Sequence, residues 1–308
     1  MINQSLYLEI NGQKQFLSIR SQSPNLPILL YIHGGPGDTA LPLMNKYNYP
    51  LENKFIFVIW EQRGAGKSYY PFKEDEHPTM QTFVDDIFYI VTYLLKQFKQ
   101  EKVFLLGHSW GSALGLKFIQ QHPQLVDTYI GCGQVVDMNE GFQSQYNFVK
   151  LKNKEKKNKR ALKRLSEIDL SLTQDNWLDD LLYVTKQVVK YKGSLYGKSN
   201  YNKLINGFIF SNDYNIKDLI NRDKGSLQSL KYLWPELMSI SFKDVKSFEV
   251  PIVFIEGRHD YHVSSVLAKK YFDSITTAKK FYWFEQSCHF PQWSEAEKFN
   301  QVVSSLVH

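Results

Sequence analysis

The chain has 308 residues, of which 43% are hydrophobic, 15% aromatic and 22% charged. This composition excludes a disordered chain, a coiled coil and a collagen-like rod, and the length predicts one large α/β unit or a core with an inserted lobe. The net charge of +6 is compatible with nucleic-acid binding, but the excess positive charge lies in residues 150–164, which hold nine basic side chains and one acidic one. No aromatic residue interleaves with them as a stacking surface would require, so we interpret the segment as a solvated helix face and expect no nucleic-acid partner.

Cysteine content and hydropathy bear on the cellular compartment. Two cysteines, Cys132 and Cys288, are too few for a disulfide framework. Residues 1–12 carry polar side chains where a signal peptide needs a basic start and an apolar run. No stretch approaches the roughly 20 apolar residues of a membrane helix. We therefore expect a cytoplasmic protein without a membrane partner.

Strand and helix patterns alternate at both ends of the chain. Apolar and polar residues alternate on both sides of Asn11-Gly12, which predicts an antiparallel hairpin. Continuous apolar runs at residues 28–32, 55–60, 102–106, 128–130 and 252–255 are typical of strands covered on both faces in a parallel sheet. Residues 79–95 and 112–121 carry apolar side chains at helical spacing. The predicted fold class is α/β with a mostly parallel sheet.

The middle of the chain has a different pattern. Strand-like runs vanish between residues 137 and 246, and helical patches appear at 178–189 and 227–237. We predict a core of residues 1–136 and 247–308 and an inserted helical cap of residues 137–246. Open parallel sheets bind ligands at the carboxyl ends of their strands, so we expect the cap to lie at that edge and to wall a pocket.

Residues 107–111 read Gly-His-Ser-Trp-Gly, between a buried strand and a helix. This is the setting of a G-x-S-x-G nucleophile elbow, in which glycines relieve crowding in a tight turn that exposes the serine above the sheet. Ser109 is therefore the candidate nucleophile. The alternative is a glycine-rich turn whose serine only caps the helix.

A serine hydroxyl needs a base to take its proton and an acid to orient that base. Asp260 follows the strand at 252–255, and His289 follows a further strand at 281–284. Ser, Asp, His is the chain order of the α/β-hydrolases. The rival acid is Asp137, and the rival histidines are His33, His108, His259 and His262.

An oxyanion hole needs two backbone N–H groups aimed at one point. In this fold one follows the nucleophile and the other comes from the loop after an earlier strand. Trp110 supplies the first, and we assign the second to Gly35, within His-Gly-Gly-Pro-Gly at residues 33–37.

At these residues the chain resembles the prolyl aminopeptidase (proline iminopeptidase) group of α/β-hydrolases. The resemblance rests on the strings at 33–37, 61–68, 107–112, 257–260 and 289–291, and it covers roughly residues 27–123 and 250 to the end. It implies an α/β-hydrolase fold and a serine peptidase that releases an N-terminal residue, often proline, from short peptides. Glu61 stands where the group usually has aspartate.

Three functions are compatible with these residues. The first is an aminopeptidase acting on short peptides through an acyl-enzyme, with no metal or cofactor required. The second is a carboxylesterase or related acyl hydrolase of small substrates, which would share the reacting residues but lack acidic groups to hold an amine. The third is a non-catalytic ligand-binding relative, which the Ser, Asp, His order disfavours.

An aminopeptidase pocket needs a carboxylate for the substrate's ammonium group, because a buried unpaired charge is costly. Glu236 follows Trp234-Pro235 in the apolar stretch 230–240, and we nominate it for this role. The alternative is a helix-start glutamate that satisfies backbone N–H groups after the proline.

Residues 64–68, Gly-Ala-Gly-Lys-Ser, suggest a phosphate-binding loop, but the first glycine of that motif would fall on Glu61. We interpret the segment as a structural loop beside the active site. Arg63 either ties this loop down through hydrogen bonds or is an ordinary surface arginine.

Overall fold

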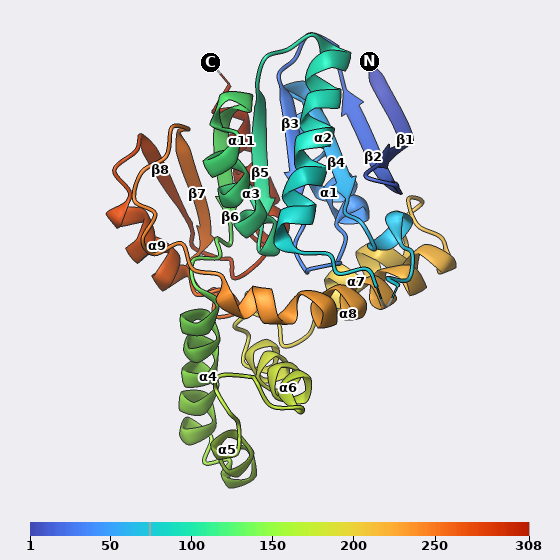
Figure 1. Ribbon diagram of the computed structural model, residues 1–308. Helices are drawn as coiled ribbons and strands as arrows, with labels where there is room; N and C mark the ends of the chain where they lie inside the picture. The colour runs from blue at the N-terminus through green and yellow to red at the C-terminus, as the bar shows by residue number, and fades with distance from the viewer. Residues whose placement is uncertain (74, 308) are drawn as a thin grey trace.

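The structure, a computed structural model, describes residues 1–73 and 75–307. One eight-stranded sheet with the order β1-β2-β4-β3-β5-β6-β7-β8 runs through its centre (Figure 1). The strands are β1 (Ile2–Ile10), β2 (Gln13–Ser21), β3 (Ile28–Ile32), β4 (Ile56–Glu61), β5 (Val103–His108), β6 (Val126–Cys132), β7 (Ile252–Gly257) and β8 (Lys279–Phe284). The pairs β1–β2 and β2–β4 are antiparallel and the other neighbours are parallel, which confirms the predicted sheet with its N-terminal hairpin.

Helices cover both faces of this sheet. The core helices are α1 (Leu41–Tyr47), α2 (Met80–Phe98), α3 (Trp110–Gln121), α9 (Ser265–Ser274), α10 (Pro291–Ser294) and α11 (Ala296–Ser304), with 3₁₀ turns η1 (Tyr49–Asn53), η2 (Gly66–Ser68) and η3 (Pro123–Leu125). Helices α2, α3 and α9 pack on one face, and α1, α10 and α11 on the other. Successive β3 residues such as Leu29 and Leu30 are fully buried in opposite clusters, which explains why this strand reads as an unbroken apolar run.

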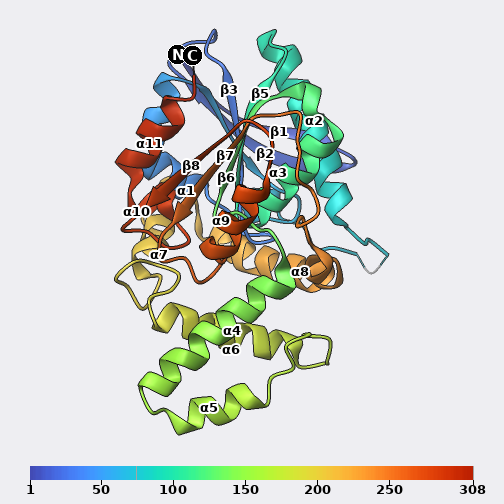
Figure 2. The same cartoon turned by 90° about the vertical axis from the view of Figure 1, so that its left-hand side faces the viewer.

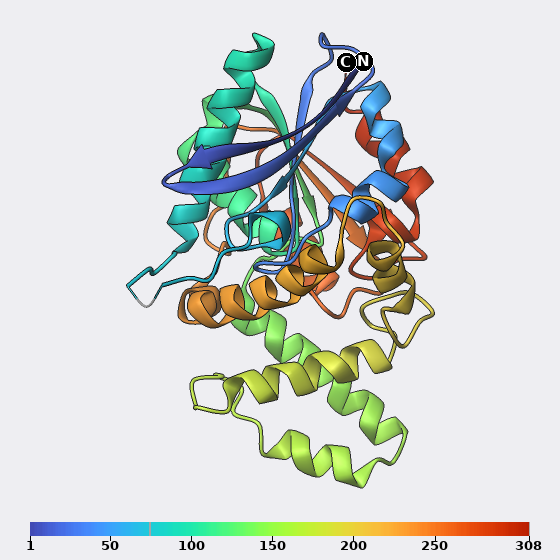
Figure 3. The same ribbon diagram turned by 90° about the vertical axis from the view of Figure 1, so that its right-hand side faces the viewer.

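Five helices lie between β6 and β7, at the carboxyl ends of the parallel strands (Figure 1). They are α4 (Met138–Glu155), α5 (Lys159–Ser166), α6 (Trp177–Lys190), α7 (Asn202–Ile209) and α8 (Ile216–Ser239), and we refer to residues 138–239 as the cap. Figures 2 and 3 show α4, α5 and α6 projecting away from the sheet, with α7 and α8 against the core. The basic segment 150–164 spans the end of α4 and most of α5, and its side chains are mostly exposed. Among the described helices, none is long and apolar enough to cross a bilayer.

Helix α8 packs on the core through backbone surfaces that approach closely. A Cβ on Gly225 would lie 2.3 Å from the carbonyl oxygen of Gly64, and one on Gly37 would lie 2.4 Å from the carbonyl oxygen of Gly225. These positions need glycine because any side chain would separate the helix from the two loops. Lys67 adds an ion pair to Asp218, at the start of α8, with a distance of 2.8 Å from Nζ to Oδ2.

We predict that Gly225→Ala loosens the cap from the core. The added methyl group has no space, so we expect a loss of about 1–3 kcal/mol in the free energy of unfolding and faster proteolysis within the cap. Chemical denaturation and limited proteolysis measure the two effects. The matched control is Gly141→Ala in α4, where a Cβ meets nothing within 4 Å. Alanine is the better helix former, so equal destabilisation by both variants would contradict the close-packing argument.

Candidate active site

Ser109 lies in a strained turn between β5 and α3. Its φ of 54° and ψ of −123° place a non-glycine residue at positive φ. A Cβ on Gly107 would lie 2.3 Å from the carbonyl oxygen of Gly111, and one on Gly111 would lie 2.1 Å from that of Ile32. The two glycines therefore permit the turn that the sequence predicts. The Ser109 side chain forms no cap hydrogen bond to α3, which argues against a purely capping role.

Asp260 and His289 come together beside this turn. Asp260 follows β7, His289 follows β8, and Nδ1 of His289 lies 2.8 Å from Oδ2 of Asp260. The other carboxylate oxygen of Asp260 accepts the N–H groups of His262 and Val263 at 2.8 and 3.0 Å. Both side chains are buried, so the contact is shielded from water.

The rival acid, Asp137, has other partners. It caps α4 by accepting the N–H of Glu140 at 2.8 Å, and it pairs with Lys243 at 3.2 Å. The Lys243 and backbone hydrogen bonds outweigh burial and lower the pKa of Asp137. Its hydrogen bonds and ion pairs within residues 1–73 and 75–307 do not involve a histidine, so the geometry favours Asp260 as the orienting acid.

Burial sets the charge state of the histidine. It lowers the pKa of His289 and raises that of Asp260, while the N–H groups of His262 and Val263 oppose the rise. The pKa of Asp260 is raised to about 7, so the carboxylate is ionised above that pH. An ionised carboxylate can only accept a hydrogen bond, so in that state Nδ1 of His289 carries the shared proton and Nε2 keeps a lone pair. A neutral imidazole with a free Nε2 is the form that a general base requires.

The competing histidines have separate environments. The rings of His108 and His262 lie 4.8 and 4.6 Å from that of His289, and burial lowers the pKa of each to about 3. His262 Nδ1 lies 3.1 Å from Ser194 Oγ, and His33 Nε2 accepts the N–H of Gln62 at 3.0 Å. The ring of His259 lies against Tyr196. The neutral rings of His108 and His262 enclose His289 without adding charge.

The loop 33–37 reaches the serine. A Cβ on Gly34 would lie 3.0 Å from Cβ of Ser109, and Gly35, with a φ of 126°, is exposed. Trp110 begins α3, where helix N–H groups have no partner within the helix. Within the described part of the chain, the backbone N–H groups of Gly35 and Trp110 have no hydrogen-bond acceptor. Both remain the proposed oxyanion donors.

A cavity of about 450 Å³ joins these groups beneath the cap, within the size range of sites for small organic ligands. Ser109 and His289 both line it, although Ser109 Oγ forms no hydrogen bond among the residues that the structure describes. The cap contributes apolar walls, including Phe142, Leu181, Leu230, Trp234 and Leu237. Two lining residues that the sequence analysis did not single out are Asp38 and Arg222.

Glu236 does not line the cavity, so the prediction that it binds the substrate's amine is wrong. Its Oε2 accepts the N–H of Met80 at 2.6 Å, at the start of α2, and it is not among the residues that line the cavity. The alternative, a glutamate at a helix start, also fails in detail, because Pro235 lies inside α8 and Glu236 is in its last turn. The carboxylate satisfies the N-terminus of a different helix.

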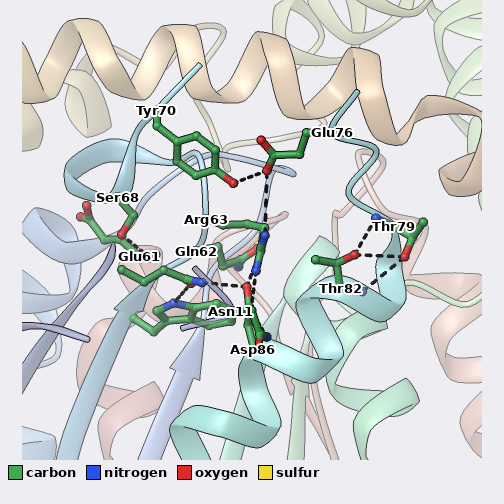
Figure 4. A network of polar contacts seen from close by, with 12 residues as sticks. Asn11, Glu61, Gln62, Arg63, Ser68, Tyr70, Glu76, Thr79, Thr82 and Asp86 are labelled. Carbon is green, nitrogen blue, oxygen red and sulfur yellow. Dashed lines mark hydrogen bonds and ion pairs between the residues drawn. The ribbon is translucent and has the colours of Figure 1, made fainter. Parts of the chain in front are cut away.

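Arg63 ties the 61–68 loop to the core (Figure 4). The guanidinium donates from Nε and Nη2 to the two oxygens of Asp86 at 2.6 and 2.7 Å, and both side chains are buried. In the same loop the Glu61 carboxylate accepts the N–H of Lys67 at 2.6 Å and the hydroxyl of Tyr214 from the segment between α7 and α8. Burial raises the pKa of Glu61 to about 7. The loop is therefore a structural bridge between core and cap.

The described residues contain no cluster of three or more histidine, cysteine and acidic side chains suited to a metal ion. The sheet, the turn at Ser109 and the buried Asp260–His289 pair are those of an α/β-hydrolase.

Comparison with known proteins gives the family. Residues 28–292 match the family model described as "Serine aminopeptidase, S33", and the chain belongs to this family. It is 30% identical to the probable aminopeptidase YbaC of Bacillus subtilis (strain 168), over 96% of this chain and 94% of that protein. It is 33% identical to a probable proline iminopeptidase of Leptolyngbya boryana, over 39% of this chain and 35% of that protein. These matches confirm the resemblance drawn from the sequence.

Solved structures agree in fold. The proline iminopeptidase of Mycobacterium smegmatis superposes with a TM-score of 0.67 at 17% identity, covering 99% of this chain and 98% of that one. A proline iminopeptidase-related protein of Thermus thermophilus gives a TM-score of 0.65 at 18% identity, covering 99% and 97%. At this identity the likeness establishes the α/β-hydrolase fold. Together with the family match, it makes the protein a hydrolase of aminopeptidase type.

Asp260→Asn is expected to lower kcat about 10⁴-fold, because the amide cannot hold His289 in the tautomer that leaves Nε2 free. Asp137→Asn is the control and is expected to change kcat by less than about tenfold. Steady-state kinetics on any substrate that the wild type hydrolyses measure both variants. Near-normal turnover of Asp260→Asn beside a large loss in Asp137→Asn would reverse the assignment of the acid.

Asp86→Ala is expected to destabilise the protein by about 3–5 kcal/mol, because it removes both short hydrogen bonds of the buried Arg63 guanidinium and leaves it only the 4.0 Å contact with Glu76. Glu285→Ala is the control, since Glu285 forms a similar two-bond pair with Arg258 at an exposed site. Solvent screens that pair, so a much smaller effect is expected. Chemical denaturation measures both, and similar losses would show that burial of the Arg63 pair is unimportant.

Proposed function

We propose that the protein is a serine hydrolase that removes the N-terminal residue, with proline among the candidates, from short peptides through an acyl-enzyme. The observation that carries the proposal is the buried Asp260–His289 pair beside the strained Ser109, in a cavity that the cap helps to line. Membership of a family described as serine aminopeptidases supports the peptidase activity.

The proposed mechanism is acyl transfer. Nε2 of His289 takes the hydroxyl proton as Oγ of Ser109 attacks the carbonyl carbon of the first residue, and Asp260 holds the imidazolium that forms. The N–H groups of Gly35 and Trp110 stabilise the oxyanion. His289 then gives its proton to the leaving amine, and the first residue stays on Ser109 as an ester. Water, deprotonated by His289, attacks that ester, and His289 returns the proton to Oγ of Ser109 as the free amino acid leaves.

The lining of the cavity supports an apolar first residue. Helices of the cap lie across the carboxyl ends of the strands and provide side chains such as Phe142 and Trp234 to the wall. These bulky apolar groups favour an apolar side chain in the first residue.

A carboxylesterase acting on small acyl esters is the second candidate. The observation in its favour is that the cap walls are largely apolar and that Glu236 lies outside the cavity. The two activities share every reacting group and differ in whether a free amine on the acyl group improves the substrate.

Labelling and a substrate panel test the proposal. We expect a fluorophosphonate probe to label the wild type once per chain and to leave Ser109→Ala unlabelled, with kcat about a millionfold lower in that variant. Ser226→Ala is the control, because Ser226 also lines the cavity and is expected to label normally. Arylamides of proline, alanine and larger apolar residues are compared with neutral acyl esters. Hydrolysis of the esters alone would contradict the aminopeptidase proposal and favour the carboxylesterase.

A further inference from the structure

The position of the substrate's amine is restricted by the chemistry of the proposed function. In an N-terminal residue the ammonium group is bonded to the carbon next to the scissile carbonyl. When the carbonyl oxygen lies between the N–H groups of Gly35 and Trp110, the ammonium group must lie close to the same loop. A carboxylate that recognises it must therefore be a near neighbour of the oxyanion hole.

Among residues 1–73 and 75–307, the acidic residues that line the cavity are Asp38 and Asp137. Both carboxylate oxygens of Asp137 already have partners, because one caps α4 and the other pairs with Lys243. Asp38 directly follows the loop 33–37. A Cβ on Gly35 would lie 2.6 Å from the backbone nitrogen of Asp38 and 3.3 Å from its Cβ. The Asp38 side chain thus begins beside the oxyanion loop.

One oxygen of Asp38 is fixed and the other is available. Oδ1 accepts the N–H of Thr39 at 2.8 Å and lies 2.7 Å from Nε of Arg222 in an ion pair. Among residues 1–73 and 75–307, Oδ2 accepts no hydrogen bond, and the ion pair with Arg222 is closest at Oδ1. The side chain is 38% exposed and lines the cavity, so an incoming donor can reach Oδ2.

The charged groups around Asp38 carry a net negative charge. Arg222 lies between two carboxylates, since its Nη1 is also 3.5 Å from Oδ1 of Asp223. Two carboxylates and one guanidinium leave one negative charge unmatched, although the exposed Asp223 is partly screened by solvent. Burial lowers the pKa of His262 and His289, so these neighbours of the cavity are neutral. An ammonium group would complete the balance.

We propose that Asp38 binds the α-ammonium group of the substrate through Oδ2, with Arg222 as a positioning residue that holds Oδ1. This proposal rests on the proposed aminopeptidase function and names its substrate class: short peptides and amides with a free amine on the carbon next to the scissile carbonyl. A charged hydrogen bond of this kind is stronger than a neutral one and stronger still where water is partly excluded. Substrates without the amine lose this interaction.

The test uses two substrates that differ only in the amine, alanine p-nitroanilide and propionyl p-nitroanilide. We expect the wild type to have the higher kcat/KM for the alanine compound. Asp38→Asn is expected to reduce the ratio of the two kcat/KM values about thirtyfold, which corresponds to about 2 kcal/mol, mainly through the KM of the alanine compound. Asparagine keeps an oxygen for Thr39 and Arg222, so the loop is expected to stay in place. Asp137→Asn is the matched control and is expected to keep the wild-type ratio.

The possible outcomes distinguish the aminopeptidase function from the role of Asp38. A wild type that hydrolyses both anilides equally would contradict the aminopeptidase function and the role of Asp38 together. A wild type that prefers the alanine compound, with the same preference in Asp38→Asn, would overturn only the role of Asp38.

Binding to the Ser109→Ala protein gives a readout that does not depend on turnover. Calorimetry is expected to show alaninamide binding more tightly than propionamide, and Asp38→Asn in that background is expected to remove the difference. Thermal melting confirms that each variant is folded.

Discussion

The positive φ of Ser109 is the constraint on which the rest of the site depends. Holding a non-glycine residue there costs about 1–3 kcal/mol, so the surrounding structure must enforce it. The N–H of Ser109 is bound to the carbonyl of Cys132 on β6 at 3.0 Å, and Gly111 packs against the carbonyl oxygen of Ile32 on β3. The turn is thus held between the two strands that flank β5. Its neighbours, the loop 33–37 after β3 and the Asp260–His289 pair after β7 and β8, meet the serine because parallel strands end at one edge.

Because the site is built at the common edge of the parallel strands, the sequence predicts the sheet and the position of the residues that follow its strands. An unbroken apolar run indicates a strand buried on both faces, and the residues just after such runs must gather at the carboxyl edge. Ser109, Asp260 and His289 each follow a strand of the parallel part of the sheet, so their proximity follows from topology alone. The predicted hairpin, the parallel sheet and the separate helical segment have the same origin, because each has a strong local periodicity. Their catalytic roles stay a proposal.

The sequence does not predict how the cap packs or which side chains line the cavity, because these contacts depend on packing between distant segments. The sequence around Pro235 suggests a helix start, yet α8 continues through the proline and places Glu236 at the N-terminus of α2. Gly225 carries no motif, and only its approach to the Gly64 carbonyl shows why it is glycine. Asp38 adjoins a recognisable string, but no pattern shows that one of its oxygens is fixed and the other is not.

The arrangement separates two tasks that a peptidase must perform. Ser109, His289, the proposed oxyanion donors and Asp38 all belong to the core, whose backbone is fixed by the sheet and by glycine packing. The apolar walls come largely from α4, α6, α7 and α8 of the cap, which lie outside the sheet. If the loop 33–37 and Asp38 locate both the carbonyl and the amine, the cap needs to recognise only the side chain between them. Selectivity for the first residue is then a matter of apolar fit in the cap, and a carboxylate on α8 is not required for recognition of the amine.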